Sequence, residues 1–173
     1  MIRDFLSNYI KQKNMQVKIS NNLKLGVYAK DLILAVIRKV GTAGDTGHAI
    51  EYCGEAISNM SMEGRMTVCN MSIEAGSRAG MVAFDETTLD YIIDRPFSPK
   101  EKELSIALES WKDLHTDDGA NYDSYVELNG LDIKPQVTWG TSPEMVVNVD
   151  EEIPHPDTAI SDSQKESISR ALN

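Results

Sequence analysis

Apolar residues recur along the chain with two spacings, one typical of helices and one typical of strands. Apolar positions three and four residues apart predict helices over residues 2–13, 29–40, 55–60, 62–77, 85–94 and 100–114. Alternating or short continuous apolar runs predict strands over residues 15–20, 23–27, 48–52, 81–84, 122–128 and 133–139. We expect Asn21-Asn22 to join the first two strands as a β-hairpin. Helices alternating with short strands indicate a layered α/β fold.

The character of the sequence changes near Asp150, which predicts the domain organisation. A chain of 173 residues is long enough for one domain with its own core. We expect residues 1–150 to belong to that domain, and residues 151–173 to form an acidic, proline-containing linker followed by the start of another segment. The first predicted helix has no cap and the last, over residues 163–172, has few apolar anchors. We therefore expect the chain to be a piece of a larger protein.

The stretch over residues 61–76 is the best candidate for a functional element. Ser61 is a suitable helix N-cap, and Gly76 a suitable stop. The middle of this predicted helix is apolar, yet it contains Asn70 and Glu74, four residues apart and therefore on one face. An amide and a carboxylate on a buried helix are costly unless they meet partners, a ligand or a metal. We expect chemistry at Asn70 and Glu74; the alternative is that both form hydrogen bonds with neighbouring backbone.

Charge and hydropathy exclude several function classes. The net charge is −10, and the basic excess of the first 40 residues lacks interleaved aromatic residues or a recognisable binding motif. A solvated surface explains that excess better than nucleic-acid binding does. No apolar run is long enough to span a membrane, and no signal-peptide pattern is present. We expect a cytoplasmic protein that binds neither nucleic acid nor membrane.

Other chemistry-bearing residues carry weaker signals. The glycine-rich residues 41–47 could cradle a phosphate, but they lack the pattern of a P-loop, and a close-packed connection is the better interpretation. Cys53 and Cys69 match no zinc spacing and are expected to be buried, unpaired thiols. His48, His115 and His155 show no metal-ligand spacing. We predict no metal site from these residues.

Longer motifs carry a family resemblance. They are residues 44–54 (GDTGHAIEYCG), 61–74 (SMEGRMTVCNMSIE), 85–88 (DETT) and 135–143 (PQVTWGTSP). With them the chain resembles the aconitase family, and within it the large subunits of 3-isopropylmalate dehydratase, from about Tyr9 to the C-terminus. The resemblance implies a layered α/β/α aconitase-type domain, here incomplete.

The resemblance also implies an activity. Such enzymes are hydro-lyases of leucine biosynthesis that interconvert 2-isopropylmalate and 3-isopropylmalate by removing and re-adding water. A [4Fe-4S] cluster held by three cysteines uses its fourth iron as a Lewis acid. By the family's Asn-x-x-x-Glu match, Asn70 would lie against the cluster, and Glu74 would hydrogen-bond the water or hydroxyl there and help to transfer its proton.

Departures from the family pattern leave alternatives open. The family's cluster cysteines lie in segments C-terminal to anything here, and Cys53 and Cys69 match neither segment. The N-terminal part of the subunit is also missing, and so is the small subunit that completes the substrate pocket as a heterodimer partner. We expect this fragment to be inactive alone. A homoaconitase-type large subunit and a non-catalytic truncated remnant remain alternatives.

Overall fold

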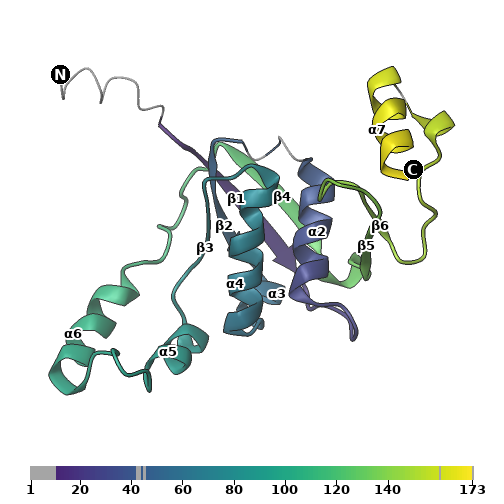
Figure 1. The fold of residues 1–173 in the computed structure, drawn as a ribbon. Coiled ribbons are helices and arrows are strands. Elements are labelled where there is room, and N and C mark those ends of the chain that lie inside the picture. The colour runs from purple at the N-terminus through teal and green to yellow at the C-terminus, as the bar shows by residue number, and fades with distance from the viewer. Residues whose placement is uncertain (1–10, 42–43, 45, 160, 173) are drawn as a thin grey trace.

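A four-stranded parallel sheet organises the part of the chain that the computed structural model describes, which is residues 11–41, 44, 46–159 and 161–172. The strand order is β3-β2-β1-β4 (Figure 1). The strands are β1 Lys13–Ser20, β2 His48–Cys53, β3 Ala79–Val82 and β4 Ser124–Asn129. The helix predicted over residues 2–13 falls largely outside the described residues, and Lys13 already belongs to strand β1.

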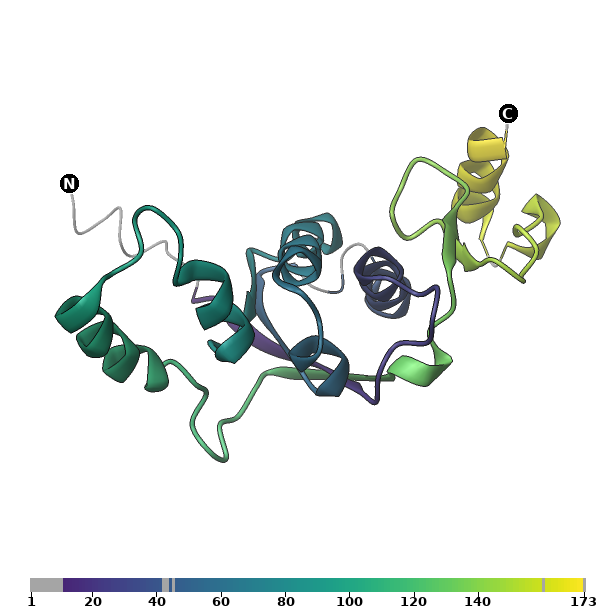
Figure 2. The same ribbon diagram turned by 90° about the horizontal axis from the view of Figure 1, so that it is seen from below.

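The core lies between one face of this sheet and a layer of helices. Alternate strand residues such as Val17, Ile19 and Ile50 are fully buried against that layer. The helices of the layer are α2 Ala29–Val40, α3 Glu55–Ser58 and α4 Met62–Met71. Figure 2 shows α2 and α4 side by side over the sheet, and the two helices contact each other. The predicted α/β class is confirmed.

Helix α2 shows how the sequence builds this layer. Its apolar residues recur every three or four positions, so that Leu32, Ile33, Val36 and Ile37 all face the core and are 0% exposed. Gly41 ends the helix directly after the predicted range: at φ 77° its N–H donates to the carbonyl of Ile37 over 2.7 Å. The match between pattern and burial explains why this helix is predicted correctly from sequence.

The opposite face of the sheet is more polar. Glu51 points to this side, where its carboxylate accepts hydrogen bonds from the hydroxyls of Thr116 and Tyr122, the latter over 2.8 Å. These contacts attach the segment before β4 to the sheet. The described residues therefore form two layers of the expected α/β/α arrangement, a sheet and one helical layer.

The predicted β-hairpin is wrong. Strand β1 pairs with β2 on one side and with β4 on the other, both in parallel, and so has no free edge for a hairpin partner. Residues 23–27 instead form a loop in which Val27 donates its N–H to the carbonyl of Lys24 over 3.0 Å. Apolar alternation in residues 23–27 was therefore a misleading signal, because Leu25 is fully exposed and only Val27 is buried.

A small antiparallel sheet joins the second half of the chain to α2. It pairs β5 Gln136–Thr138 with β6 Val146–Asn148, a strand that the sequence analysis missed. Asp31 links this sheet to α2: one carboxylate oxygen accepts the N–H of Tyr28 at the helix start over 2.9 Å, and the other accepts the N–H of Gln136 over 2.8 Å. A single side chain thus stabilises the helix start and fixes where β5 begins.

The remaining elements flank these sheets. They are the helices α5 Glu86–Ile92, α6 Glu101–Lys112 and α7 Asp162–Leu172, and the 3₁₀ turns η1 Ser72–Ala75, η2 Gly130–Asp132 and η3 Pro156–Thr158. Helices are confirmed near the positions predicted for α5, α6 and α7. No residue of α6 is buried, although Trp111 packs its ring against Phe84 with centroids 5.2 Å apart. The division into residues 1–150 and 151–173 stays a prediction.

Burial on α2 can be tested with a pair of leucines. We expect Leu32→Ala to lower the free energy of unfolding by roughly 2–5 kcal/mol, because it leaves a cavity in a fully buried site. Leu25→Ala, in the exposed loop, should change it by less than about 0.5 kcal/mol. Chemical denaturation followed by circular dichroism measures both. Equal losses in the two variants would contradict the assignment of the core.

Candidate functional site

Helix α4 begins as predicted but does not run on regularly to Gly76. Ser61 caps it, with its hydroxyl oxygen accepting the N–H of Gly64 over 3.3 Å. The α-helix ends at Met71 and continues as the 3₁₀ turn η1, after which Gly76 takes a left-handed conformation at φ 88°. Glu74 therefore lies on the 3₁₀ turn and not on the α-helix itself.

Buried hydrogen bonds fix the position of this turn. The Ser72 hydroxyl is fully buried, donates to the carbonyl of Val68 over 2.8 Å and lies 2.7 Å from the hydroxyl of Tyr52 on β2. The Ser77 hydroxyl in turn donates to the carbonyl of Ser72 over 2.8 Å. Because a buried polar group left unpaired is costly, these bonds hold η1 in one place on the sheet. The backbone that carries Glu74 is thus positioned by the core.

Asn70 and Glu74 are both exposed, so the prediction that they lie on a buried helix is wrong. The helix is not buried around them: Met66 and Ile73 are 46% and 54% exposed, while the buried side chains of α4 are Arg65 and Val68. In the described structure neither polar group bears a cost of burial. Both are instead accessible to whatever approaches this side of α4, and their predicted roles remain predictions.

Glu74 lines a groove of about 290 Å³, which we call the Glu74 groove. Its walls come from three segments that are far apart in sequence. They are Met71 at the end of α4 with Glu74 on η1, Lys30 and Leu34 on α2, and Thr138 at the end of β5 with residues 140–143 that follow it. Asn70 does not line it. Since Asp31 holds the first residue of β5 to the start of α2, it also places the third wall of the groove.

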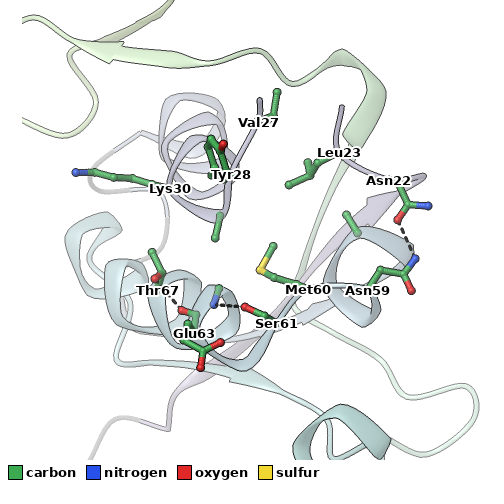
Figure 3. Close-up of a pocket in the computed structure, with 13 residues that line it drawn as sticks. Asn22, Leu23, Val27, Tyr28, Lys30, Asn59, Met60, Ser61, Glu63 and Thr67 are labelled. Carbon is green, nitrogen blue, oxygen red and sulfur yellow. Dashed lines mark hydrogen bonds between the residues drawn. The ribbon is translucent and has the colours of Figure 1, made fainter. Parts of the chain in front are cut away.

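A larger groove of about 610 Å³ lies beside it, between the start of α2 and the segment from α3 to α4 (Figure 3). Leu23, Val27 and Met60 give it an apolar lining, and Asn59 bonds Asn22 across its rim over 2.8 Å. Neither Asn70 nor Glu74 lines this groove. The two grooves share one lining residue, Lys30, whose side chain extends away from Leu23 and Met60 in Figure 3.

The most highly buried charge of α4 is Arg65, which the sequence analysis missed. It is 3% exposed, and its guanidinium donates to both carboxylate oxygens of Asp85 at 2.6 Å and to the carbonyls of Ser58 and Met60 at 2.8 and 3.1 Å. Hydrogen bonding from Arg65 lowers the pKa of Asp85 below its usual value. This pair ties α4 to the start of α5. Nothing in the spacing of the two residues indicates that they meet.

The other candidates are dispersed. Cys53 at the end of β2 and Cys69 on α4 are free thiols, half-buried, and burial raises the pKa of each. Within residues 11–41, 44, 46–159 and 161–172, no group of three or more His, Cys, Asp and Glu side chains is arranged to hold a metal. His48 is buried at the start of β2, whereas His115 and His155 are exposed. The glycine-rich segment lies partly outside the described residues.

The described helices include none that is long and apolar enough to cross a bilayer.

Comparison with known proteins places the chain in a family. The family model described as the aconitase family (aconitate hydratase) matches residues 6–173. The chain belongs to the aconitase family. The parallel sheet with helices fits this assignment, and the resemblance noted in the sequence is confirmed.

Within the aconitase family, the chain is similar to curated proteins named 3-isopropylmalate dehydratase large subunit. It is 53% identical over 161 residues to that of Psychrobacter cryohalolentis, and 54% identical over 162 residues to that of Azotobacter vinelandii. These matches cover 93% and 94% of this chain but 34% of either relative. The chain thus spans about a third of the length of the relatives it matches.

The Arg65–Asp85 pair can be tested by removing one charge. We expect Asp85→Asn to cost roughly 1.5–3 kcal/mol of the free energy of unfolding at neutral pH, because it leaves the buried guanidinium without its carboxylate. Asp150→Asn breaks an exposed pair with Lys134 of the same 2.6 Å length and should cost much less, because water screens both charges. Denaturant titration at pH 7 compares the two.

The pH dependence of stability follows from the lowered pKa. Asp85 is ionised more readily in the folded chain than in the unfolded chain, so its contribution is complete above the ordinary carboxyl pKa of about 4. That contribution is lost as the pH falls through the lower, folded-state pKa. The difference in stability between the native chain and Asp85→Asn should therefore shrink on acidification. A difference independent of pH would argue against the ion pair.

Proposed function

We propose that this chain is part of the large subunit of a hydro-lyase that interconverts 2-isopropylmalate and 3-isopropylmalate in leucine biosynthesis. The identity of 53–54% to proteins of that name, over nearly all of this chain, is the main support. The accessibility of Glu74 in a groove adds a chemical reason, because dehydration and rehydration need a group that exchanges a proton with water. A small-subunit partner and a cytoplasmic location belong to the same proposal.

Glu74 is the proposed acid–base group. Its carboxylate takes and returns the proton of the water that is removed from one isomer and added to the other. The buried bonds of Ser72 hold its backbone in place, which favours reaction because little reorganisation is then needed. The walls of the Glu74 groove give a small organic acid a place beside the carboxylate.

Asn70 is proposed to contact the iron–sulfur cluster of the complete subunit. When bound, the cluster supplies a Lewis acid for the leaving hydroxyl. The described residues do not offer its ligands, because Cys53 and Cys69 stand in separate elements and no cluster of metal-ligating side chains is present among them. What this chain offers is an exposed amide one turn before Glu74. The ligands are assigned to cysteines elsewhere in the subunit.

The central test replaces Glu74 in the full-length subunit, assembled with its small subunit and cluster. We expect Glu74→Gln to lower kcat for 2-isopropylmalate by about 10²–10⁴-fold, because the amide cannot exchange the proton. The visible absorbance of the cluster should stay unchanged. Glu63→Gln is the matched control, since Glu63 is an exposed glutamate on α4, the helix before η1, and does not line the Glu74 groove. Unchanged turnover in Glu74→Gln would remove Glu74 from the mechanism.

The same turnover assay distinguishes the proposed function from its alternatives. Turnover of a homocitrate-derived substrate in preference to 2-isopropylmalate would assign the subunit to a homoaconitase instead. Absence of turnover by the assembled, cluster-containing protein on either substrate would contradict an enzymatic role.

A spectroscopic measurement tests the proposed role of Asn70 separately. In the assembled enzyme, Asn70→Ala should speed the loss of cluster absorbance in air, because a hydrogen bond to the cluster or to its cysteine ligands is removed. Asn121→Ala, in an exposed loop beyond α6, should not change that rate. Equal rates for the native enzyme and Asn70→Ala would place the cluster away from Asn70.

A further inference from the structure

Lys30 stands out among the residues that line the Glu74 groove. It is the second residue of α2 and is exposed, and no hydrogen bond or ion pair joins its ammonium to a described residue. A cation in the first turn of a helix is disfavoured by the helix dipole. Lys30 is also followed at the helical spacings by apolar Ile33 and Leu34, so no neighbour on the helix compensates for it. Helix stability therefore does not explain a lysine at this position.

The surroundings of Lys30 suggest an anion as its partner. Lys30 and Glu74 line the same groove, and the segment between β5 and β6 adds Thr141 and Ser142, whose hydroxyls can donate hydrogen bonds. Leu34 and Met71 add apolar side chains to the lining of the groove. An ammonium with nearby hydroxyl donors is a suitable recognition site for a carboxylate, because charge-assisted hydrogen bonds are the stronger kind.

The size of the groove limits the ligand. Its volume of about 290 Å³ lies just below the usual range for ligand sites, which is about 300–1,000 Å³. A small organic acid fits this space. Asp31 and Ser72 hold two walls of the groove through hydrogen bonds, so these walls are in place before a ligand enters.

We propose that the Glu74 groove is a carboxylate-binding subsite in which the ammonium of Lys30 binds one carboxylate of the substrate while Glu74 serves the reacting centre. This inference rests on the proposed function, which supplies the dicarboxylate substrate. It adds a binding residue from α2, a segment outside the Asn-x-x-x-Glu motif. Lys30 thereby sets affinity, and Glu74 sets the rate of proton transfer.

The test uses the full-length subunit assembled with its small subunit and cluster. We expect Lys30→Gln to raise KM for 2-isopropylmalate about 10- to 100-fold, the range for losing a charge-assisted hydrogen bond, with kcat changed less than about threefold. Lys30→Arg keeps the charge and should recover most of the affinity. Lys24→Gln is the matched control, because Lys24 is exposed in the preceding loop and lines neither groove; its KM should equal that of the native enzyme.

A substrate-side change makes the assignment specific. Two monoamides of 2-isopropylmalate, one for each carboxylate, are compared by competition with the unmodified substrate. The monoamide that lacks the carboxylate held by Lys30 should bind the native enzyme at least tenfold more weakly. In the Lys30→Gln enzyme the same carboxylate-to-amide change should weaken binding only slightly, because the ammonium that pairs with this carboxylate is already absent. Equal weakening in the native enzyme and in Lys30→Gln, for both carboxylates, would overturn the proposal.

Failure of this inference is distinguishable from failure of the proposed function. An unchanged KM in Lys30→Gln, together with the loss of turnover in Glu74→Gln, would overturn the role of Lys30 and leave the proposed function standing. Loss of the cluster or of the small subunit in Lys30→Gln would also overturn it, since an exposed side chain that contacts only substrate leaves both in place. No turnover of 2-isopropylmalate by the native enzyme would overturn both.

Discussion

Parallel pairing of β1 on both edges is the constraint on which the rest of this structure depends. Each residue from Met15 to Lys18 has partners on both β2 and β4, so the backbone groups at the centre of the sheet are satisfied far from water. Parallel neighbours cannot be joined by a tight turn, and the chain must cross the sheet between them. The crossings are α2, and α3 followed by α4, which pack together over the buried face.

The grooves follow from these crossings. Because α2 and α4 lie side by side, residues of both helices line the larger groove near their first turns, and a second space, the Glu74 groove, remains beside Leu34 of α2 and Met71 at the end of α4. Two polar side chains set the limits of that space. Asp31 fixes the small sheet against the start of α2, and Ser72 fixes η1 against Tyr52 of the main sheet. The hydrogen bonds of each side chain position residues that are far away in sequence.

The sequence predicts well those elements whose signal is local. Helix α2 has an unbroken apolar stripe with a glycine stop, and the Ser61 cap of α4 and the Asp85 cap of α5 act within one turn. It predicts poorly whatever depends on pairing between distant segments. Residues 23–27 and 15–20 look like neighbouring strands, but the true partners of β1 lie at 48–53 and 124–129, and no local pattern encodes that choice.

The residues of the candidate site also divide into those that local sequence patterns predict and those that they do not. Motif residues identified Glu74, whereas Lys30 and residues 140–143 join it only through packing of distant elements. The predicted burial of the helix around Asn70 and Glu74 was wrong for a physical reason. A methionine-rich stretch indicates an apolar helix, but methionine is also common at protein surfaces that bind partners. Met66 and Ile73 are examples of apolar side chains that stay exposed near Asn70 and Glu74. The polar residue that does need a buried partner is Arg65, and it finds one in Asp85.

Exposure of Glu74 also bears on what a complete site requires. A carboxylate open to water is well solvated, and its electrostatic influence on a reaction is weakened by the high dielectric of the solvent. Proton transfer in a hydro-lyase gains from a site that admits one water and excludes the rest. In the proposed enzyme, the remaining two-thirds of the subunit and the small subunit cover Met66, Ile73 and Glu74. The described chain then supplies a fixed proton-transfer group and a cation for the substrate, and segments beyond it supply the metal and the enclosure.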